Sequence, residues 1–260
     1  MPPFTYSIVI PCYNEGQRVG DSLEKIVSYT QNRGWNTEIL VVNDGSRDNT
    51  VDVVRSFTRR YGNVRLIENP GNRGKGYSVR NGVLSATGDI ILFTDADLSS
   101  PIEESEKLFG ALEAGADVAL GSRWLRSELQ TNRQPLYRQL LGRMFNVALR
   151  LILGLDFKDT QCGFKAFRRT AAQTIFPRQR IDRWGFDPEI LYLARKFKLR
   201  TVEVPVSWAH DHRSKISPVR DGSRMMWEML RVRANDVAGK YERPSFTPPV
   251  QPAAVEKLAR

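Results

Sequence analysis

A run of apolar and β-branched residues that ends at two aspartates is the feature that most constrains the fold of this chain. Residues 90–94, Ile-Ile-Leu-Phe-Thr, have the composition of a buried strand, and Asp95 and Asp97 follow directly. Residues 100–103, Ser-Pro-Ile-Glu, then have the spacing of a helix start, with Ser100 as its N-cap. We therefore expect both carboxylates on a turn at the carboxyl end of a strand, where open α/β sheets bind their ligands.

The two aspartates indicate a metal site at this turn. Carboxylates this close repel each other unless a cation lies near them. Oxygen ligands suit Mg²⁺ or Mn²⁺, which are often shared with substrate phosphates. An isolated Asp-x-Asp is more often a solvated turn, but the preceding strand and the following helix start favour the metal site here. We expect Asp95 and Asp97 to hold Mg²⁺ or Mn²⁺ as the cofactor.

Strand and helix patterns alternate along the first half of the chain, which is typical of an α/β fold. A parallel sheet with helices on both faces follows from this alternation. A further strand over residues 201–206 is expected at a sheet edge, because Pro205 cannot donate to a ladder. The other expected strands are residues 7–10, 38–42, 64–67 and 118–122. We divide the chain into a catalytic domain (1–220), a C-terminal amphipathic helix (221–240) and a Pro-rich flexible tail (241–260).

Charge and composition narrow the classes of partner. The net charge of +10 suggests anionic partners such as nucleotides or phospholipid surfaces. The arginines are dispersed rather than grouped in a block, so nucleic acid is not an expected partner. No apolar run approaches the length of a membrane span, and residues 1–6 lack a signal-peptide pattern. Cys12 and Cys162 lack metal-ligand spacing, which indicates free thiols in a reducing compartment and a cytoplasmic location.

Polar residues also follow the first two expected strands, at residues 11–15 and 43–46. The second of these, taken alone, could be no more than a turn. Three polar strand ends in one half of a sheet, however, fit a nucleotide crevice. The glycine-rich residues 72–76 offer backbone N–H groups, with Arg73 and Lys75, at a helix start, which suits a phosphate. This segment has neither the P-loop nor the dinucleotide-binding spacing.

Four short segments occur together in the order and spacing of one family: residues 10–15 (Ile-Pro-Cys-Tyr-Asn-Glu), 42–46 (Val-Asn-Asp-Gly-Ser), 72–76 (Asn-Arg-Gly-Lys-Gly) and 95–97 (Asp-Ala-Asp). Together they resemble the inverting family-2 glycosyltransferases of the GT-A fold. The later segment 159–165 (Asp-Thr-Gln-Cys-Gly-Phe-Lys) is similar to the polyprenyl- and dolichyl-phosphate hexosyltransferases. The Arg-Gly-Lys-Gly turn resembles their dolichyl-phosphate glucosyltransferase branch. The resemblance covers roughly Tyr6 to Arg233.

The resemblance implies a GT-A fold with a mostly parallel sheet and an enzyme, a hexosyltransferase. Its expected reaction is metal-dependent, inverting transfer of a hexose from a nucleotide sugar to polyprenyl or dolichyl phosphate, with glucose and UDP-glucose as the expected hexose and donor. Three other functions remain open: a family-2 transferase with a soluble sugar, glycan or glycolipid acceptor, a sugar nucleotidyltransferase, and a basic binding module without enzymatic activity. Some relatives carry Gln at the position of Ser99 as a further metal ligand.

The resemblance also assigns site residues. Asp97 and Asp187 are the expected catalytic residues; Asp187 precedes a proline and could equally be an N-cap. An acceptor phosphate is already ionised, so we expect Asp187 to orient it rather than to deprotonate it. The expected donor-binding residues are Pro11, Tyr13, Glu15, Asp44, Ser46, Arg73, Lys75, Asp95, Ala96 and Asp97. The expected acceptor-phosphate residues are Arg123, Arg138, Arg213 and Lys215. Of these, Arg213 and Lys215 are placed by their charge alone and could instead clamp the donor diphosphate.

Two segments combine apolar and basic residues at helical spacing. One half of a helix over residues 135–155 collects apolar side chains, including Val147 and Leu151, and the other half carries Arg143 and Arg150. Residues 224–233 repeat the theme with methionines, Trp227 and arginines. Both segments could be core helices with solvated basic faces. The alternative is that they lie on an anionic membrane, which predicts a peripheral protein on the cytoplasmic face.

Overall fold

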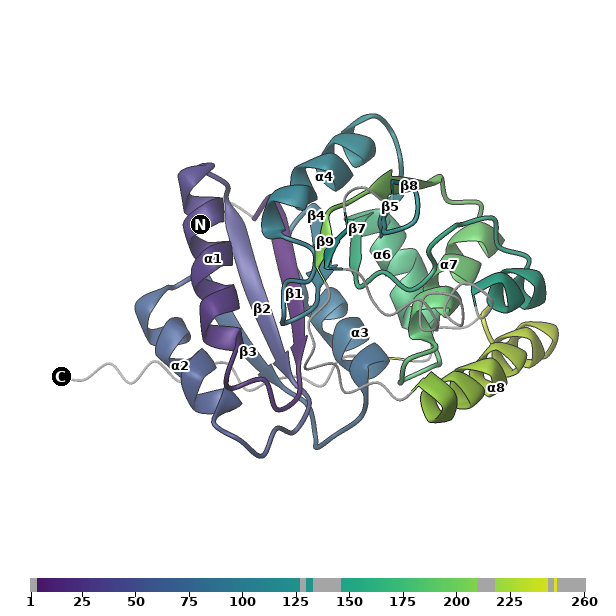
Figure 1. Cartoon of the computed structure of the whole chain (residues 1–260), viewed down its shortest axis with the longest axis horizontal. Coiled ribbons are helices and arrows are strands. Elements are labelled where there is room, and N and C mark those ends of the chain that lie inside the picture. Colours follow the sequence, from purple (N-terminus) through teal and green to yellow (C-terminus); the bar gives the residue numbers. More distant parts are fainter. Residues whose placement is uncertain (1–3, 127–129, 133–145, 210–217, 243–245, 247–260) are drawn as a thin grey trace.

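A seven-stranded sheet with the strand order β3-β2-β1-β4-β7-β5-β8 forms the centre of the fold (Figure 1). The computed structural model describes residues 4–126, 130–132, 146–209, 218–242 and 246. The predicted α/β architecture is confirmed. The strands of the sheet are β1 (Tyr6–Cys12), β2 (Thr37–Asn43), β3 (Val64–Glu68), β4 (Ile90–Thr94), β5 (Val118–Ser122), β7 (Phe164–Arg168) and β8 (Thr201–Pro205).

The sheet is mixed because β7 runs against its neighbours. β1 pairs in parallel with β2 and β4, so that Ile8 lies opposite Ile39 on one side and Leu92 on the other. β3 extends the parallel half beyond β2, and β8 pairs in parallel with β5 at the far edge, as Pro205 predicts. β7 is antiparallel to both β4 and β5. It was not among the predicted strands, although the resemblance drew attention to its first residues.

Helices cover both faces of the sheet, and alternate strand residues face each layer (Figure 1). Ile8 and Ile10 pack with one layer, whereas Val9 packs with the other. The first layer holds α1 (Val19–Asn32), α2 (Thr50–Arg60) and α4 (Ser105–Glu113). The second layer holds α3 (Lys75–Ser85), α6 (Arg169–Ile175), α7 (Phe186–Lys196) and α8 (Pro218–Val237). The structure also describes helical residues 146–153, η1 (Ile102–Glu104), η3 (Phe176–Arg178) and a small sheet of β6 (Gln130–Asn132) and β9 (Trp208–Ala209).

The helix after the two aspartates begins differently from the prediction. It starts as the 3₁₀ turn η1, and its N-cap is Pro101, without a side-chain hydrogen bond. The predicted capping by Ser100 is therefore wrong. Pro101 has extended backbone angles, φ −56° and ψ 147°, which place it before the first turn instead of inside it.

The C-terminal part of the described chain is packed against the second layer. Met229 and Val232 of α8 are buried in its core. Within the segment predicted as a tail, Tyr241 is fully buried, and the ring of Phe246 contacts Tyr77 edge-on. Aromatic burial continues here beyond α8, a feature that the proline-rich composition of the segment does not signal.

Two helical glycines predict opposite responses to the same substitution. A Cβ at Gly82 of α3 would lie 2.4 Å from Val9 Cγ1 and 2.8 Å from Val42 Cγ2, because α3 packs closely on the sheet. Gly82→Ala should lower the free energy of unfolding by about 1–3 kcal/mol through overpacking. Gly110 of α4 has no atom within 4 Å of such a Cβ. Gly110→Ala should raise stability by about 0.5–1 kcal/mol, since alanine loses less backbone entropy.

Urea unfolding of both variants measures these changes. Stabilisation by Gly82→Ala, or equal losses in the two variants, would contradict this account of helix–sheet packing.

Candidate active site

The carboxyl ends of β1, β2 and β4 meet where the strand order reverses around β1. Such a reversal opens a crevice in which α/β proteins bind ligands. Residues 13–15, 44–46 and 95–97 follow these strand ends, and Pro11 is the last residue but one of β1. The fold thus brings together the predicted donor-binding residues, with Pro11 buried and Tyr13 exposed at the rim.

Asp44 organises the glycine-rich turn that borders this crevice. It is buried, and its Oδ1 and Oδ2 accept hydrogen bonds from the backbone N–H groups of Arg73 (2.9 Å) and Gly74 (2.8 Å). Asn69 Nδ2 also donates to Asp44 Oδ1 at 2.9 Å. Ser46 ties the first two strand ends together, because its Oγ accepts from the N–H of Asn14 at 2.9 Å. Asp44 and Ser46, both predicted to bind the donor, therefore hold the backbone of the neighbouring loops in place.

Lys75, at the start of α3, reaches across to the paired aspartates. Its Nζ lies 2.6 Å from Asp95 Oδ1 and 5.5 Å from the centre of the Trp184 ring. Burial disfavours its charge, but the carboxylates of Asp95, Asp187 and Asp97 outweigh burial and raise the pKa of Lys75 above its usual value. These four charged groups share one electrostatic environment, in which the lysine stays cationic.

Asp97 lies on a turn with unusual backbone geometry. Its Oδ1 accepts from the N–H of Ser99 at 2.9 Å, and its Oδ2 lies 3.9 Å from Arg18 Nη1. Leu98 between them has φ +47°, a left-handed conformation rare for a branched residue. Arg18 also pairs with Glu15, a predicted donor residue. Outliers of this kind concentrate at ligand sites, which supports a functional turn.

The donor set of this turn fits a divalent cation that is shared with a diphosphate. Asp95 and Asp97 are carboxylates with part of their side chains exposed, and Mg²⁺ often takes one or two carboxylates with the rest of its ligands from phosphates and water. Among the described residues, no group of three or more His, Cys, Asp and Glu could hold an ion by itself. Ser99 contributes its backbone N–H to Asp97.

Asp187 forms a buried ion pair with Lys165 of β7. The lysine is fully buried and its Nζ lies 2.5 Å from Asp187 Oδ1 and 2.6 Å from the carbonyl oxygen of Cys162. The ring of Phe93 lies 5.4 Å from the same nitrogen. The N-cap of α7 is Gly185, so the N-cap interpretation of Asp187 is wrong. Asp187 instead lies in the first turn, directed into the core beneath the crevice.

Arg123 follows β5 and is held by a second buried carboxylate. Its Nε and Nη2 lie 2.7 and 2.8 Å from the two oxygens of Asp159, a bidentate geometry. Burial disfavours both charges, but each partner outweighs it: the pKa of Asp159 is lowered and that of Arg123 is raised. The other predicted acceptor residues, Arg138, Arg213 and Lys215, lie outside the described residues.

Three charged residues of the site were not predicted as functional. Arg18 has no motif that would mark it. Lys165 and Asp159 stand in the segment 159–165 that carries the resemblance, and that segment was the available signal. Position 163 of this segment requires a glycine, because a Cβ there would lie 2.1 Å from Asp95 Oδ2. The segment therefore passes directly against the paired aspartates.

Comparison with known proteins identifies the family. The sequence model of the family described as glycosyl transferase family 2 matches residues 7–176 of the chain. The chain belongs to this family. This glycosyltransferase is 38% identical over 224 residues to a dolichyl-phosphate beta-glucosyltransferase of Trichomonas vaginalis, which covers 81% of this chain and 66% of the relative. It is 36% identical to the dolichyl-phosphate beta-glucosyltransferase of Drosophila melanogaster, with 92% of this chain and 78% of the relative covered.

A solved structure confirms the GT-A type of fold. Glucosyl-3-phosphoglycerate synthase from Mycobacterium tuberculosis, in complex with Mn²⁺, UDP and glucosyl-3-phosphoglycerate, superimposes with a TM-score of 0.65 at 19% identity. The superposition covers 93% of this chain and 81% of that protein. The chain spans about two thirds to three quarters of the length of the sequence relatives.

The Lys165–Asp187 pair predicts a large and specific loss of stability. Lys165→Met leaves a buried carboxylate without its cation, which should lower the free energy of unfolding by about 3–5 kcal/mol. Arg55→Met removes a cation from a pair with Glu68 in which both side chains are about half exposed, and should cost less than about 1 kcal/mol. Denaturant unfolding of both variants measures the difference. Similar small losses would show that the buried pair contributes little to the folded state.

Proposed function

We propose that this glycosyltransferase transfers glucose from UDP-glucose to a dolichyl or other polyprenyl phosphate with inversion. The proposal is carried by the convergence of Asp44, Lys75, Asp95 and Asp97 on one crevice in a chain whose curated relatives are named dolichyl-phosphate beta-glucosyltransferases. UDP and UDP-glucose are named with solved structures of the same fold, which supports a uridine donor.

The residues of the crevice divide the work on the donor. The turn held by Asp44 directs Lys75 toward the diphosphate, and Asp95 and Asp97 would hold Mg²⁺ or Mn²⁺ beside it. A divalent cation at this place would offset the charge on the departing diphosphate. Lys75, kept cationic by its carboxylate neighbours, adds a positive charge on the same side. The donor is thus oriented with its leaving group toward the cations.

The acceptor brings its own nucleophile, since a phosphate oxygen is ionised near neutral pH. Asp187 is bound to Lys165 and serves in this proposal to position the attacking side of the crevice rather than to accept a proton. Arg123, held rigidly by Asp159, is the described cation assigned to the acceptor phosphate, with Arg138, Arg213 and Lys215 as further candidates. The attacking oxygen then displaces the diphosphate in line at the anomeric carbon.

Glucose transfer from labelled UDP-glucose into a lipid extract of dolichyl phosphate tests the proposal. Asp97→Asn should lower turnover by about two orders of magnitude or more, because it removes a leading charge at the donor. Asp52→Asn, an exposed carboxylate on α2, should retain activity. Chelation should abolish transfer and added Mn²⁺ or Mg²⁺ should restore it.

Full activity of Asp97→Asn, or full activity in chelator, would contradict the donor assignment. Transfer to a soluble sugar phosphate with none to lipid phosphate would contradict the acceptor. Release of pyrophosphate from a nucleoside triphosphate and a sugar phosphate would identify a nucleotidyltransferase instead.

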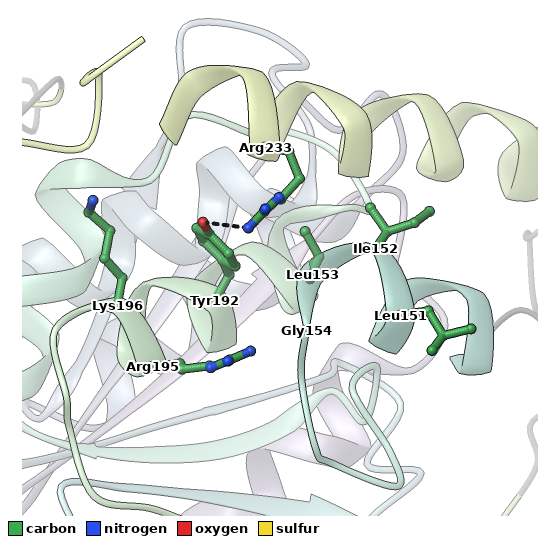
Figure 2. Close-up of a pocket in the computed structure, with 8 residues that line it drawn as sticks. All are labelled: Leu151, Ile152, Leu153, Gly154, Tyr192, Arg195, Lys196 and Arg233. Carbon is green, nitrogen blue, oxygen red and sulfur yellow. Dashed lines mark hydrogen bonds between the residues drawn. The ribbon is translucent and has the colours of Figure 1, made fainter. Parts of the chain in front are cut away.

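We infer that the enzyme works at an anionic membrane surface through a basic groove beside α8. A cavity of about 410 Å³ opens between the helical residues 146–153, the end of α7 and α8 (Figure 2). Arg195 lies over Gly154, and Arg233 donates to the Tyr192 hydroxyl at 3.3 Å. The lining residues are Leu151, Ile152, Leu153, Gly154, Tyr192, Arg195, Lys196 and Arg233.

Exposed apolar side chains lie on two of the helices that border this groove. Leu151 is 79% exposed and Val147 50%, whereas Leu149 and Leu153 of the same helix are buried in the core. The apolar half predicted from periodicity is thus the solvent-facing one in the described residues. Trp227 of α8 is 65% exposed. Apolar groups ringed by arginines are what an interfacial surface requires.

α8 connects this surface with the crevice. Glu228, on its buried side, accepts a hydrogen bond from the N–H of Gly185 at 2.9 Å, just before the helix that carries Asp187. A lipid phosphate held at the crevice would therefore have its chain beside exposed α8 residues such as Trp227. No helix within the described ranges has the length and apolar character needed to span a bilayer.

Flotation with phosphatidylserine vesicles tests the membrane surface. Arg195→Glu/Arg233→Glu should weaken binding at least about tenfold, since each cation near an anionic surface contributes about 1 kcal/mol. Arg59→Glu/Arg60→Glu changes the net charge equally on α2, at the other end of the molecule in Figure 1, and should bind as the unaltered protein does. Binding should also fall with salt. Equal losses in both pairs would indicate attraction by net charge and contradict a docking surface at the groove.

A further inference from the structure

Glu189 of α7 is a fully buried carboxylate that the proposed reaction does not use. Its Oε1 accepts from the N–H of Arg180 at 3.0 Å and from the hydroxyl of Tyr241 at 2.8 Å. Its Oε2 accepts from the N–H of Ile181 at 2.9 Å. Burial raises the pKa of Glu189 to about 7, against these hydrogen bonds. One carboxyl group thus joins the segment after α8 to the loop of residues 179–183.

The loop of residues 179–183 is in turn the support of the glycine-rich turn. The carbonyl oxygen of Asp182 accepts from the N–H of Tyr77 at 3.0 Å. Gln179 Nε2 donates to the carbonyl oxygen of Gly76 at 3.0 Å. The loop and the turn lie so close together that a Cβ at Gly74 would be 2.4 Å from the carbonyl oxygen of Asp182.

Arg80 fastens the loop to α3 a second time. Its Nη1 lies 2.6 Å from the carbonyl oxygen of Gln179, and its Nη2 lies 2.7 Å from Asp182 Oδ1. The loop therefore contacts both the glycine-rich turn, at Gly74 and Gly76, and the first turns of α3, at Tyr77 and Arg80. A shift of the loop would move Lys75, which lies beside Asp95 in the donor crevice.

We propose that Glu189 and Tyr241 are positioning residues for the nucleotide donor. Tyr241, from beyond α8, fixes Glu189, Glu189 fixes residues 180 and 181, and the loop sets the position of Lys75 against Asp95. The inference rests on the proposed donor site but not on the acceptor. It assigns to Tyr241, in the segment after α8, a role in nucleotide affinity that acts through Glu189 and not through contact with the nucleotide.

The two positions allow a graded test. Tyr241→Phe removes one hydroxyl donor and keeps the ring. Glu189→Gln keeps the shape but replaces one acceptor oxygen by an NH₂ group, which faces a backbone N–H with which it cannot bond. Tyr29→Phe is the matched control, because the Tyr29 hydroxyl also donates to a glutamate, Glu106, on the opposite layer of the sheet.

UDP binding by calorimetry at pH 8, above the raised pKa of Glu189, is the first readout. The dissociation constant should rise at least threefold in Tyr241→Phe and at least tenfold in Glu189→Gln, and stay within twofold in Tyr29→Phe. Transfer at saturating UDP-glucose should remain near that of the unaltered protein in Tyr241→Phe, so that KM for the donor changes and kcat does not.

Amide hydrogen exchange of residues 73–80 without ligand is the second readout. Exchange there should quicken in Tyr241→Phe and not in Tyr29→Phe. Unchanged UDP affinity and unchanged exchange in a folded Tyr241→Phe would overturn the inference, whether or not Glu189→Gln folds. If the unaltered protein binds UDP and Tyr241→Phe binds it equally, this inference alone fails. If none of the proteins binds UDP, both it and the proposed donor fail.

Discussion

The site depends on matching buried or crowded carboxylates with cations from other parts of the chain. In a low-dielectric crevice, neighbouring carboxylates repel each aspartate. A cation within a few ångströms adds an attraction that outweighs this repulsion. Every such pair here joins segments that are distant in sequence or separated by a turn. The pairs are Lys75 with Asp95, Arg18 with Asp97, Lys165 with Asp187 and Arg123 with Asp159. The fold is therefore constrained as much by charge balance as by its apolar core.

Local periodicity predicted most of the architecture because the strands and helices of the first half satisfy it residue by residue. β1, β2, β3, β4 and β5 lie where alternating or continuous apolar runs place them. The edge position of β8 followed from one proline. The paired aspartates were placed correctly at a strand end, since the first four residues of the strand before them are apolar.

β7 is a strand that local periodicity does not predict. Its second residue is Lys165, which in a strand pattern indicates a solvent-facing side chain. The lysine is instead fully buried, because Asp187, a residue from α7, neutralises it. No local pattern reveals a partner supplied by the other layer. Asp159 and Arg123 are hidden in the same way, and the helix cap at Ser100 failed because Pro101 is extended rather than helical.

The edge strands have a consequence for how these molecules meet in concentrated solution. An open edge presents backbone groups that a strand of another molecule can pair with, which leads to aggregation. β8 includes Pro205, which has no N–H to offer, and β3 carries the charged, exposed residues Arg65 and Glu68. Both ends of the sheet thus resist the addition of a foreign strand. Crowding would bring copies close together without allowing their sheets to join edge to edge.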